Sequence, residues 1–456
     1  MPGEDDLTEE QMPDAAVSTT QAVPASGLGE RLRSLRLTAG LTQTELAGDR
    51  FSKEYVSQIE RGKTRPTRET VEWVAKRLGV DPDFLAVGVS AATRDRVEAA
   101  LARAEALTLA NNAEEALDVF AAIRSDVGAT GAPELEVRTL VGEARALVRT
   151  GDIRRGLELL QAARGLVEGP SFSDVDRADV LLRMAIGRYL QSNIATAVGL
   201  LDEAFSLAER SQMPCDVLRA EILQWRSACR RRQRDFEAAR EDVERAIELA
   251  QSGADKRTLA NTYFQASVVA EKTGHWILSR NYAQQAKALF QELEDDRAVG
   301  RMTLNLGGLH YQLGNPTEAA EHLKLAFALA VEAGSQPDAG QAVNGLATVY
   351  LRLEDYTAAE ESARKALELL EGREDFLDEI GQSHLNLGHA LMEQGLLDEA
   401  EQSFRAGDAV FEQSASLGQR AGAWVALGDL ATRRGDDRDA ARHYRNAAEA
   451  LREIRF

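Results

Sequence analysis

The sequence is poor in cysteine and has no long apolar run. Cys215 and Cys229 are its 2 cysteines in 456 residues, which excludes a disulfide framework, and we expect both to be reduced core residues. No stretch reaches the roughly 18 apolar residues that a membrane-spanning helix needs. The first residues, MPGEDDLTEEQMPD, lack the basic start and apolar centre of a signal peptide. These absences predict a cytoplasmic protein without membrane contact.

Motifs of catalysis and metal binding are absent as well. The sequence contains no phosphate-binding glycine loop and no nucleophile elbow. Its 6 histidines are scattered, and the two nearest in sequence are His384 and His389. A helix turns residues with that spacing away from a common face, whereas zinc-binding helices place two histidines at i and i+4. We therefore predict no enzyme activity, no metal site and no cofactor.

Charge is distributed unevenly along the chain. The formal net charge is -20, but residues 1–27 and 81–456 carry all of the excess negative charge, and residues 28–80 are net basic. At physiological salt the Debye length is about 8 Å, so acidic surface several nanometres away does not cancel a local basic patch. The overall acidity therefore does not exclude binding to nucleic acid.

The first 90 residues predict an unstructured acidic tail and one small helical domain. Residues 1–27 are rich in Pro, Ser, Thr, Ala and acids without apolar periodicity, which is typical of disorder. From residue 28 the apolar spacing is helical, and the first helix is expected to end at Gly40. The next four helices have start signals at Thr42, Ser52, Thr67 and Asp81. We therefore predict five short helices in residues 28–87.

The remainder of the chain is an internal repeat. A small residue followed one helical turn later by a larger one recurs nine times, every 40 to 42 residues. The small residues are Ala116, Gly156, Ala197, Ala239, Ser279, Ala319, Ala359, Ala400 and Ala440. Each repeat fits two helices joined by a tight turn, and stacked hairpins share the core that one hairpin alone cannot bury. Residues 92–456 are thus predicted to form a solenoid of about nine helical hairpins.

Residue types within the repeats fit helical hairpins. Gly307, Gly388 and Gly428 lack a side chain where two helices approach closely, and Leu323, Phe404 and Tyr444 are larger groups that we expect between hairpins. Gly314, Gly395 and Gly435 are expected to end the first helix in a left-handed conformation. This pattern resembles the tetratricopeptide family over residues 92–456, with a HEAT-type array as the alternative. The predicted fold class is all-α.

Residues 28–87 resemble a second family. The run LTQTELA at 41–47, the run VSQIERGKTRP at 56–66 and the sequence LGV at 78–80 match the Xre/Cro-repressor helix-turn-helix family, whose domain has the lambda-repressor fold. In that family the third helix enters the major groove of DNA. The resemblance therefore implies double-stranded DNA as a partner.

The third predicted helix has an apolar and a polar face. Val56 and Ile59 lie on one side, where they can pack on the rest of the domain. Glutamine can pair with adenine, lysine can reach guanine, and glutamate can accept from cytosine. The resemblance implies base contacts by Lys53, Glu54 and Gln58. The helical register places Ser57 outward beside them and Tyr55 oblique, and we expect both to contact bases as well.

Phosphate contacts are expected around this helix. Gln43 and Ser52 stand at helix starts, where backbone N–H groups favour phosphate oxygens. Arg61, Lys63 and Arg65 follow the third helix in a loop that would run beside the DNA backbone. A use of the domain for protein contacts instead of DNA is the alternative.

Three other residues of this domain are expected to be structural. By resemblance Arg36 and Glu60 pair with each other inside the domain. Separately, we expect Trp73 to be a core residue. The turn GDRF, at 48–51, is one residue shorter than is common in the family, and Gly48 is expected to replace the usual turn glycine.

The first helices of the hairpins are expected to line a concave groove for a peptide or protein segment. The candidates by register are polar or aromatic residues: Gln224, Arg231, Arg232, Asn261, Lys272, Arg301, Tyr311, Asn344, Arg352 and His389. A solvated inner face or contacts between hairpins are the alternative interpretation of each.

Together these features predict a bacterial transcription regulator. One helix-turn-helix reads too few bases alone, so a homodimer on two half-sites about 34 Å apart is expected, with the repeats as the dimerising surface. The alternative is a tetratricopeptide adaptor that binds a protein partner.

Overall fold

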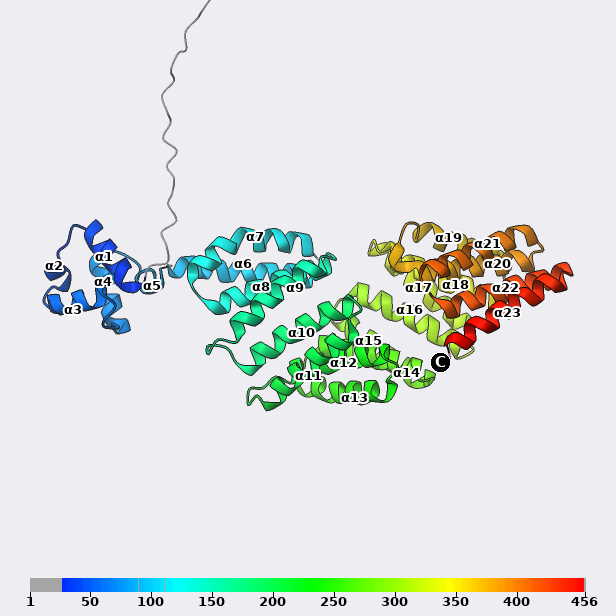
Figure 1. The fold of residues 1–456 in the computed structure, drawn as a ribbon, viewed down its shortest axis with the longest axis horizontal. Helices are drawn as coiled ribbons and strands as arrows, with labels where there is room; N and C mark the ends of the chain where they lie inside the picture. Colours follow the sequence, from blue (N-terminus) through cyan, green and yellow to red (C-terminus); the bar gives the residue numbers. More distant parts are fainter. Residues whose placement is uncertain (1–26, 89, 111, 455–456) are drawn as a thin grey trace, which may run out of the picture. The chain divides into compact units, whose positions relative to one another are not determined.

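The computed structural model describes residues 27–88, 90–110 and 112–454, and all regular structure in these ranges is helical (Figure 1). The predicted tail lies outside the described residues except for Gly27. Five short helices follow it, as predicted. They are α1 (Leu28–Thr38), α2 (Gln43–Ala47), α3 (Lys53–Glu60), α4 (Arg68–Leu78) and α5 (Pro82–Val87).

The predicted start signals are the actual helix caps. Thr42 and Glu45 form a reciprocal capping box, in which the Glu45 N–H donates to Thr42 Oγ1 over 3.1 Å and the Thr42 N–H donates to Glu45 Oε2 over 2.7 Å. The side chains of Ser52, Thr67 and Asp81 accept backbone N–H groups at the starts of α3, α4 and α5. Local sequence therefore determines where these helices begin.

One apolar cluster joins the five helices. Leu46, Val56, Ile59 and Val74 each have 2% or less of their surface exposed. Val56 and Ile59 thus face inward from α3, as predicted, and leave the opposite side of that helix to solvent.

Eighteen further helices form nine hairpins in the described part of the repeats (Figure 1). The hairpins pair α6 (Ala91–Leu109) with α7 (Ala113–Thr130), α8 (Pro133–Arg149) with α9 (Ile153–Val167), α10 (Asp174–Leu190) with α11 (Ile194–Arg210), α12 (Asp216–Arg232) with α13 (Phe236–Ser252), α14 (Lys256–Lys272) with α15 (Trp276–Glu292), α16 (Asp296–Gln312) with α17 (Pro316–Glu332), α18 (Gln336–Arg352) with α19 (Tyr356–Leu369), α20 (Leu377–Glu393) with α21 (Leu397–Gln413), and α22 (Leu417–Arg434) with α23 (Asp437–Ile454). The 3-10 turn η1 (Glu374–Phe376) precedes α20. The predicted nine-hairpin solenoid is confirmed.

Close helix contact explains the small residues of the repeat. A Cβ atom placed on Gly388 of α20 would lie 2.5 Å from Cδ1 of Phe404 on α21, so any side chain there would collide with the ring. Gly307 and Gly428 meet Leu323 and Tyr444 in the same way. These large residues therefore pack first against a glycine of their own hairpin, and the prediction that they fill the space between hairpins was incomplete.

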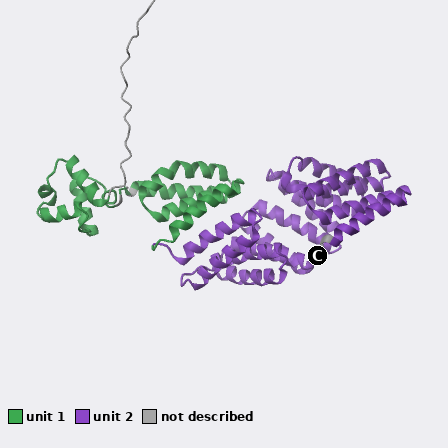
Figure 2. Cartoon of the chain, viewed as in Figure 1, with its two compact units in different colours: residues 1–170 green, residues 171–456 purple. Residues whose placement is uncertain are grey.

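The chain forms two compact units, residues 1–170 and residues 171–456 (Figure 2). The first contains α1 to α9 and the second contains α10 to α23. The division falls inside the repeat array, at a place that the repeat pattern did not predict. The predicted domain limits, 28–87 and 92–456, stay predictions.

Cys215 and Cys229 are both free thiols and both buried, as predicted. Burial raises the pKa of the Cys229 thiol to about 11, so it stays protonated at neutral pH. No helix in the described ranges is long and apolar enough to cross a membrane.

Candidate nucleic-acid interface and ligand groove

Helix α3 presents a polar face that no other part of the domain covers. Ser52 Oγ accepts the backbone N–H of Tyr55 over 3.1 Å and fixes the start of the helix. Lys53, Glu54 and Gln58 are exposed, opposite the buried Val56 and Ile59. The three residues with implied base-reading roles therefore share one accessible face.

The other two residues predicted to contact bases are less accessible. Tyr55 and Ser57 are half-buried. The Tyr55 ring centroid lies 5.3 Å from that of Phe51, so the ring packs along the edge of the domain core. Base contacts by Tyr55 and Ser57 stay predictions.

The loop after α3 folds back over the end of the helix. The Gly62 N–H donates to the Ile59 carbonyl over 2.9 Å, and the Lys63 N–H donates to the Gln58 carbonyl over 2.9 Å. Gly62 has a φ angle of +68°, which a glycine adopts without strain. This turn sets the direction in which Arg61, Lys63 and Arg65 leave the helix, and all three are exposed.

A buried ion pair anchors α3 to α1. Arg36 Nε donates to Glu60 Oε1 over 2.6 Å, and the two side chains are only 9% and 3% exposed. Burial opposes ionisation of Glu60, but hydrogen bonds from Arg36 and Gln43 outweigh it and lower the pKa of that carboxyl. The predicted pairing of Arg36 with Glu60 is confirmed.

Gln43 has an internal role that the sequence did not reveal. Its Nε2 donates to Glu60 Oε2 over 2.7 Å, which makes the side chain part of the buried network. Its contact with phosphate stays a prediction, as does that of Ser52. The internal role could have been inferred from Glu60, because a buried carboxylate has more acceptor sites than one arginine fills and needs a further donor.

Gly48 is the turn glycine of the domain, as expected. Its φ angle is +55°, and a Cβ atom there would lie 3.0 Å from Arg77 Nη1 and 3.3 Å from Trp73 Cη2. Trp73 is half-buried, between the Phe51 ring at 5.2 Å and the Arg77 guanidinium at 5.4 Å. The tryptophan therefore belongs to the margin of the core and not to its centre.

All ten predicted groove residues lie on the first helices of their hairpins, α12, α14, α16, α18 and α20. Several of them contact a neighbouring hairpin. The Arg232 guanidinium lies 4.2 Å from the centre of the Tyr189 ring on α10, and the Arg352 guanidinium lies 5.1 Å from the Tyr311 ring on α16. These contacts fit the alternative interpretation, in which the residues join hairpins.

Asn344 also joins two hairpins. Asn386 Nδ2 on α20 donates to Asn344 Oδ1 on α18 over 2.9 Å and lies 3.0 Å from Thr348 Oγ1. Asn386 is 2% exposed and was not among the predicted residues. The signal was present in its position, since Asn386 stands two residues before Gly388 as Asn305 stands two before Gly307.

Gln224 and His389 are not freely available to a ligand. Gln224 is 9% exposed. The His389 ring packs edge-on against Phe404, with the ring centroids 5.0 Å apart, and burial lowers the pKa of the imidazole.

The remaining three predicted groove residues on α12 and α14 differ in their surroundings. Asn261 is half-buried, and Lys272 Nζ lies 3.4 Å from Glu271 Oε1. Arg231 is half-buried, and its Nε has no hydrogen-bond partner among the described residues.

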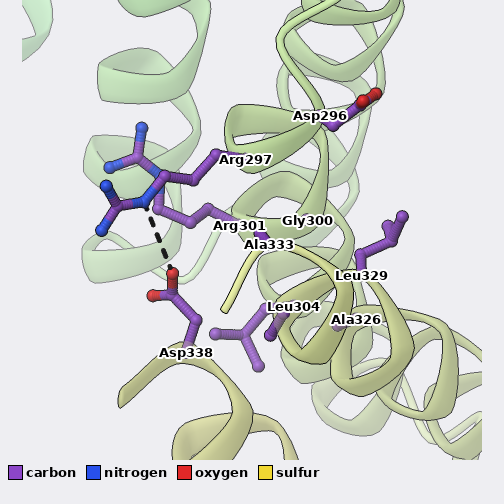
Figure 3. A pocket seen from close by; sticks show the side chains of 10 residues that line it. Asp296, Arg297, Gly300, Arg301, Leu304, Ala326, Leu329, Ala333 and Asp338 are labelled. Carbon is purple, nitrogen blue, oxygen red and sulfur yellow. Dashed lines mark ion pairs between the residues drawn. The ribbon is translucent and has the colours of Figure 1, made fainter. Parts of the chain in front are cut away.

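A small hollow borders Arg301. It is lined by residues of α16, α17 and α18, and Figure 3 shows Arg297 and Arg301 extending from α16 toward Asp338. Arg297 Nε lies 3.9 Å from Asp338 Oδ2, while Arg301 makes no ion pair with a described residue. Arg301 is thus the predicted groove residue whose charge is most available.

The geometry defines two parts: a helix-turn-helix domain with an exposed third helix, and a solenoid of helical hairpins. Comparison with known families agrees with both. A family described as a helix-turn-helix domain matches residues 27–87, and tetratricopeptide repeat families match residues 299–372, 381–409 and 423–455. The chain therefore carries a helix-turn-helix domain followed by tetratricopeptide repeats.

One curated relative resembles the N-terminal domain. Over 63 residues, 14% of this chain, the sequence is 41% identical to the HTH-type transcriptional regulator DdrOP3 of Deinococcus deserti. This chain spans 49% of that relative's length.

Solved structures resemble the solenoid. A Rap protein complexed with Competence and Sporulation Factor has a TM-score of 0.56 at 17% identity, covering 79% of this chain and 98% of the other. The apo form of the quorum sensor NprR from B. thuringiensis has a TM-score of 0.57 at 13% identity, covering 78% and 99%. At these identities the likeness concerns the fold.

Proposed function

We propose that this protein is a DNA-binding transcription regulator. The observation that carries the proposal is the exposed polar face of α3, with Lys53, Glu54 and Gln58 on a helix whose other face is buried. The likeness of this domain to a relative named as a transcriptional regulator supports it. In this proposal α3 enters the major groove, where those side chains reach base edges.

The loop after α3 holds the DNA backbone in this proposal. Arg61, Lys63 and Arg65 are exposed and supply positive charge that the domain itself does not neutralise. Such contacts position a protein on the duplex without reading sequence, and they dominate its affinity.

The solenoid is proposed to sense a peptide or a protein segment. Its fold resembles a Rap protein solved with Competence and Sporulation Factor and the quorum sensor NprR. Arg301 is the predicted groove residue with the most available charge, since it is exposed and makes no ion pair with a described residue. A homodimer formed through the repeats would place two α3 helices on two half-sites about 34 Å apart.

An adaptor that binds a protein partner through the same solenoid is the second candidate. The contacts of Arg232, Arg352 and Asn344 between hairpins favour it, since they reduce the polar surface left for a peptide to be sensed in the groove. Both candidates are binding proteins, and neither assigns an enzymatic reaction to the chain.

Binding to random duplex DNA at several salt concentrations tests the proposal. A protein with about six phosphate contacts loses affinity with a slope of about -5 in a plot of log binding constant against log salt. A flat plot, or no binding at low salt, would contradict DNA binding and favour the adaptor.

A further inference from the structure

The side-chain carboxamide of Gln58 accepts a hydrogen bond from the loop that follows α3. Thr64 Oγ1 donates a hydrogen bond to Gln58 Oε1 over 3.1 Å. Gln58 is exposed on the polar face of α3, whereas Thr64 is half-buried in the loop that follows. Among the described residues, Lys53 and Glu54 show no comparable hydrogen bond, so the carboxamide of Gln58 is the oriented group on this face.

The backbone explains how Thr64 reaches Gln58. The bond from the Lys63 N–H to the Gln58 carbonyl closes a turn over the last residues of α3. Gly62 permits the turn through its positive φ angle, and Pro66 restricts the conformation of the preceding residue. Thr64 therefore stands beside the Gln58 side chain because of the loop geometry, independently of any ligand.

Fixing the oxygen of a carboxamide also fixes its NH2 group. The two groups lie on opposite sides of the same planar carbon, so an Oε1 turned toward Thr64 turns Nε2 away from it. Glutamine pairs with adenine through both groups, donating to N7 and accepting from N6. Guanine presents two acceptors, N7 and O6, and needs only donors.

We propose that Thr64 is a positioning residue that presents the NH2 group of Gln58 to the major groove and makes this side chain favour guanine over adenine. The inference rests on the proposed function, because it assumes that α3 reads DNA. It differs from the expectation for an unrestrained glutamine, which favours adenine.

Three variants of the full chain test the proposal by selection from a pool of random DNA. Gln58→Ala identifies the operator position that Gln58 reads, since preference is lost there. Thr64→Val keeps the shape of the side chain but removes the hydroxyl, and Thr64→Ser keeps the hydroxyl. We expect guanine at this position for the unchanged chain and for Thr64→Ser.

For Thr64→Val we expect the preference for guanine over adenine to fall about fivefold, the effect of losing one neutral hydrogen bond. An equal loss of affinity for all sequences would indicate a purely structural role and would overturn the proposal. Cytosine or adenine as the preferred base of the unchanged chain would overturn it as well.

These outcomes separate the inference from the proposed function. If the unchanged chain selects a defined sequence but Thr64→Val selects the same base with the same discrimination, only the inference fails. If the unchanged chain selects no sequence, the proposed function fails and the inference fails with it. The free energy of unfolding of Thr64→Val, measured in urea, shows whether the variant is folded.

Discussion

Positive charge has different partners in the two parts of the chain. The ion pairs seen in residues 27–88 are Arg36–Glu60, Arg50–Glu69 and Arg68–Glu72, and none of them includes the loop after α3. In the solenoid, by contrast, Arg226 lies 2.7 Å from Asp242 and 2.9 Å from Asp202, and Arg183 pairs with Asp179 and Glu221. These two half-buried arginines of the solenoid are neutralised within the solenoid, whereas the small domain keeps a basic loop open to a polyanion.

The difference separates charge used for folding from charge used for binding. A buried arginine must be paired, because its removal from water is costly without a counter-charge. Exposed pairs contribute little to stability, so an exposed loop can leave its charges unpaired at almost no cost. The position of a charged side chain relative to the core therefore indicates its role better than the number of charges in a domain does.

The largest expected effect comes from breaking the buried pair of the small domain. Glu60→Ala leaves the Arg36 guanidinium buried without a counter-charge, and we expect a loss of about 3–5 kcal/mol in the free energy of unfolding of this domain. Hydrogen exchange in the full chain, followed at the amides of α1 to α4, measures it. Glu54→Ala, which removes an exposed carboxylate, is the matched control and should change the exchange little. Equal effects of both substitutions would contradict the account.

A smaller effect is expected where the solenoid helices touch. Gly388→Ala puts a methyl group 2.5 Å from the Phe404 ring, and the overpacking should cost about 1–3 kcal/mol in the free energy of unfolding. Gly308→Ala is the control, since its added Cβ atom meets nothing within 4 Å. Urea unfolding of both variants checks the prediction, and a destabilised Gly308→Ala with an unaffected Gly388→Ala would contradict it.

Acid should destabilise the solenoid more than the small domain, which has no histidine in residues 27–88. Burial lowers the pKa of His384 and of His389 in the folded state, so the unfolded chain binds protons first as the pH falls. The two neutral histidines therefore contribute fully to the free energy of unfolding above the unfolded-state pKa of about 6.5. This contribution is lost as the pH falls below that value, which lowers the free energy of unfolding by on the order of 1 kcal/mol.

Hydrogen exchange of both parts at pH 7 and pH 5.5 measures this difference. The variant His384→Gln/His389→Gln should lose part of the pH dependence of the solenoid. Unchanged pH dependence in that variant would show that other groups carry it.

Sequence patterns predicted the features that depend on residues close together in the chain better than those that depend on distant contacts. The caps at Thr42, Ser52, Thr67 and Asp81 depend on residues within one helical turn, and all four are present. The repeat likewise predicted nine hairpins, because its glycines and alanines mark contacts inside each hairpin.

Contacts between hairpins were harder to foresee. The bonds that Asn386 makes and the packing of Arg232 on Tyr189 join residues about one repeat apart. Their formation depends on how side chains meet across neighbouring hairpins, which periodicity does not specify. For the same reason several predicted groove residues proved to be contacts within the solenoid, and the division into two units was missed.

The salt dependence of DNA binding tests the central contrast most directly. Two double variants compare the two parts of the chain. Lys63→Ala/Arg65→Ala removes two charges from the loop after α3, and Arg438→Ala/Arg445→Ala removes two charges from α23. All four side chains are exposed and make no ion pair with a described residue. If the loop alone serves DNA, the first variant should reduce the slope from about -5 to about -3, and the second should leave it at about -5. Equal slopes for the two variants would contradict the account.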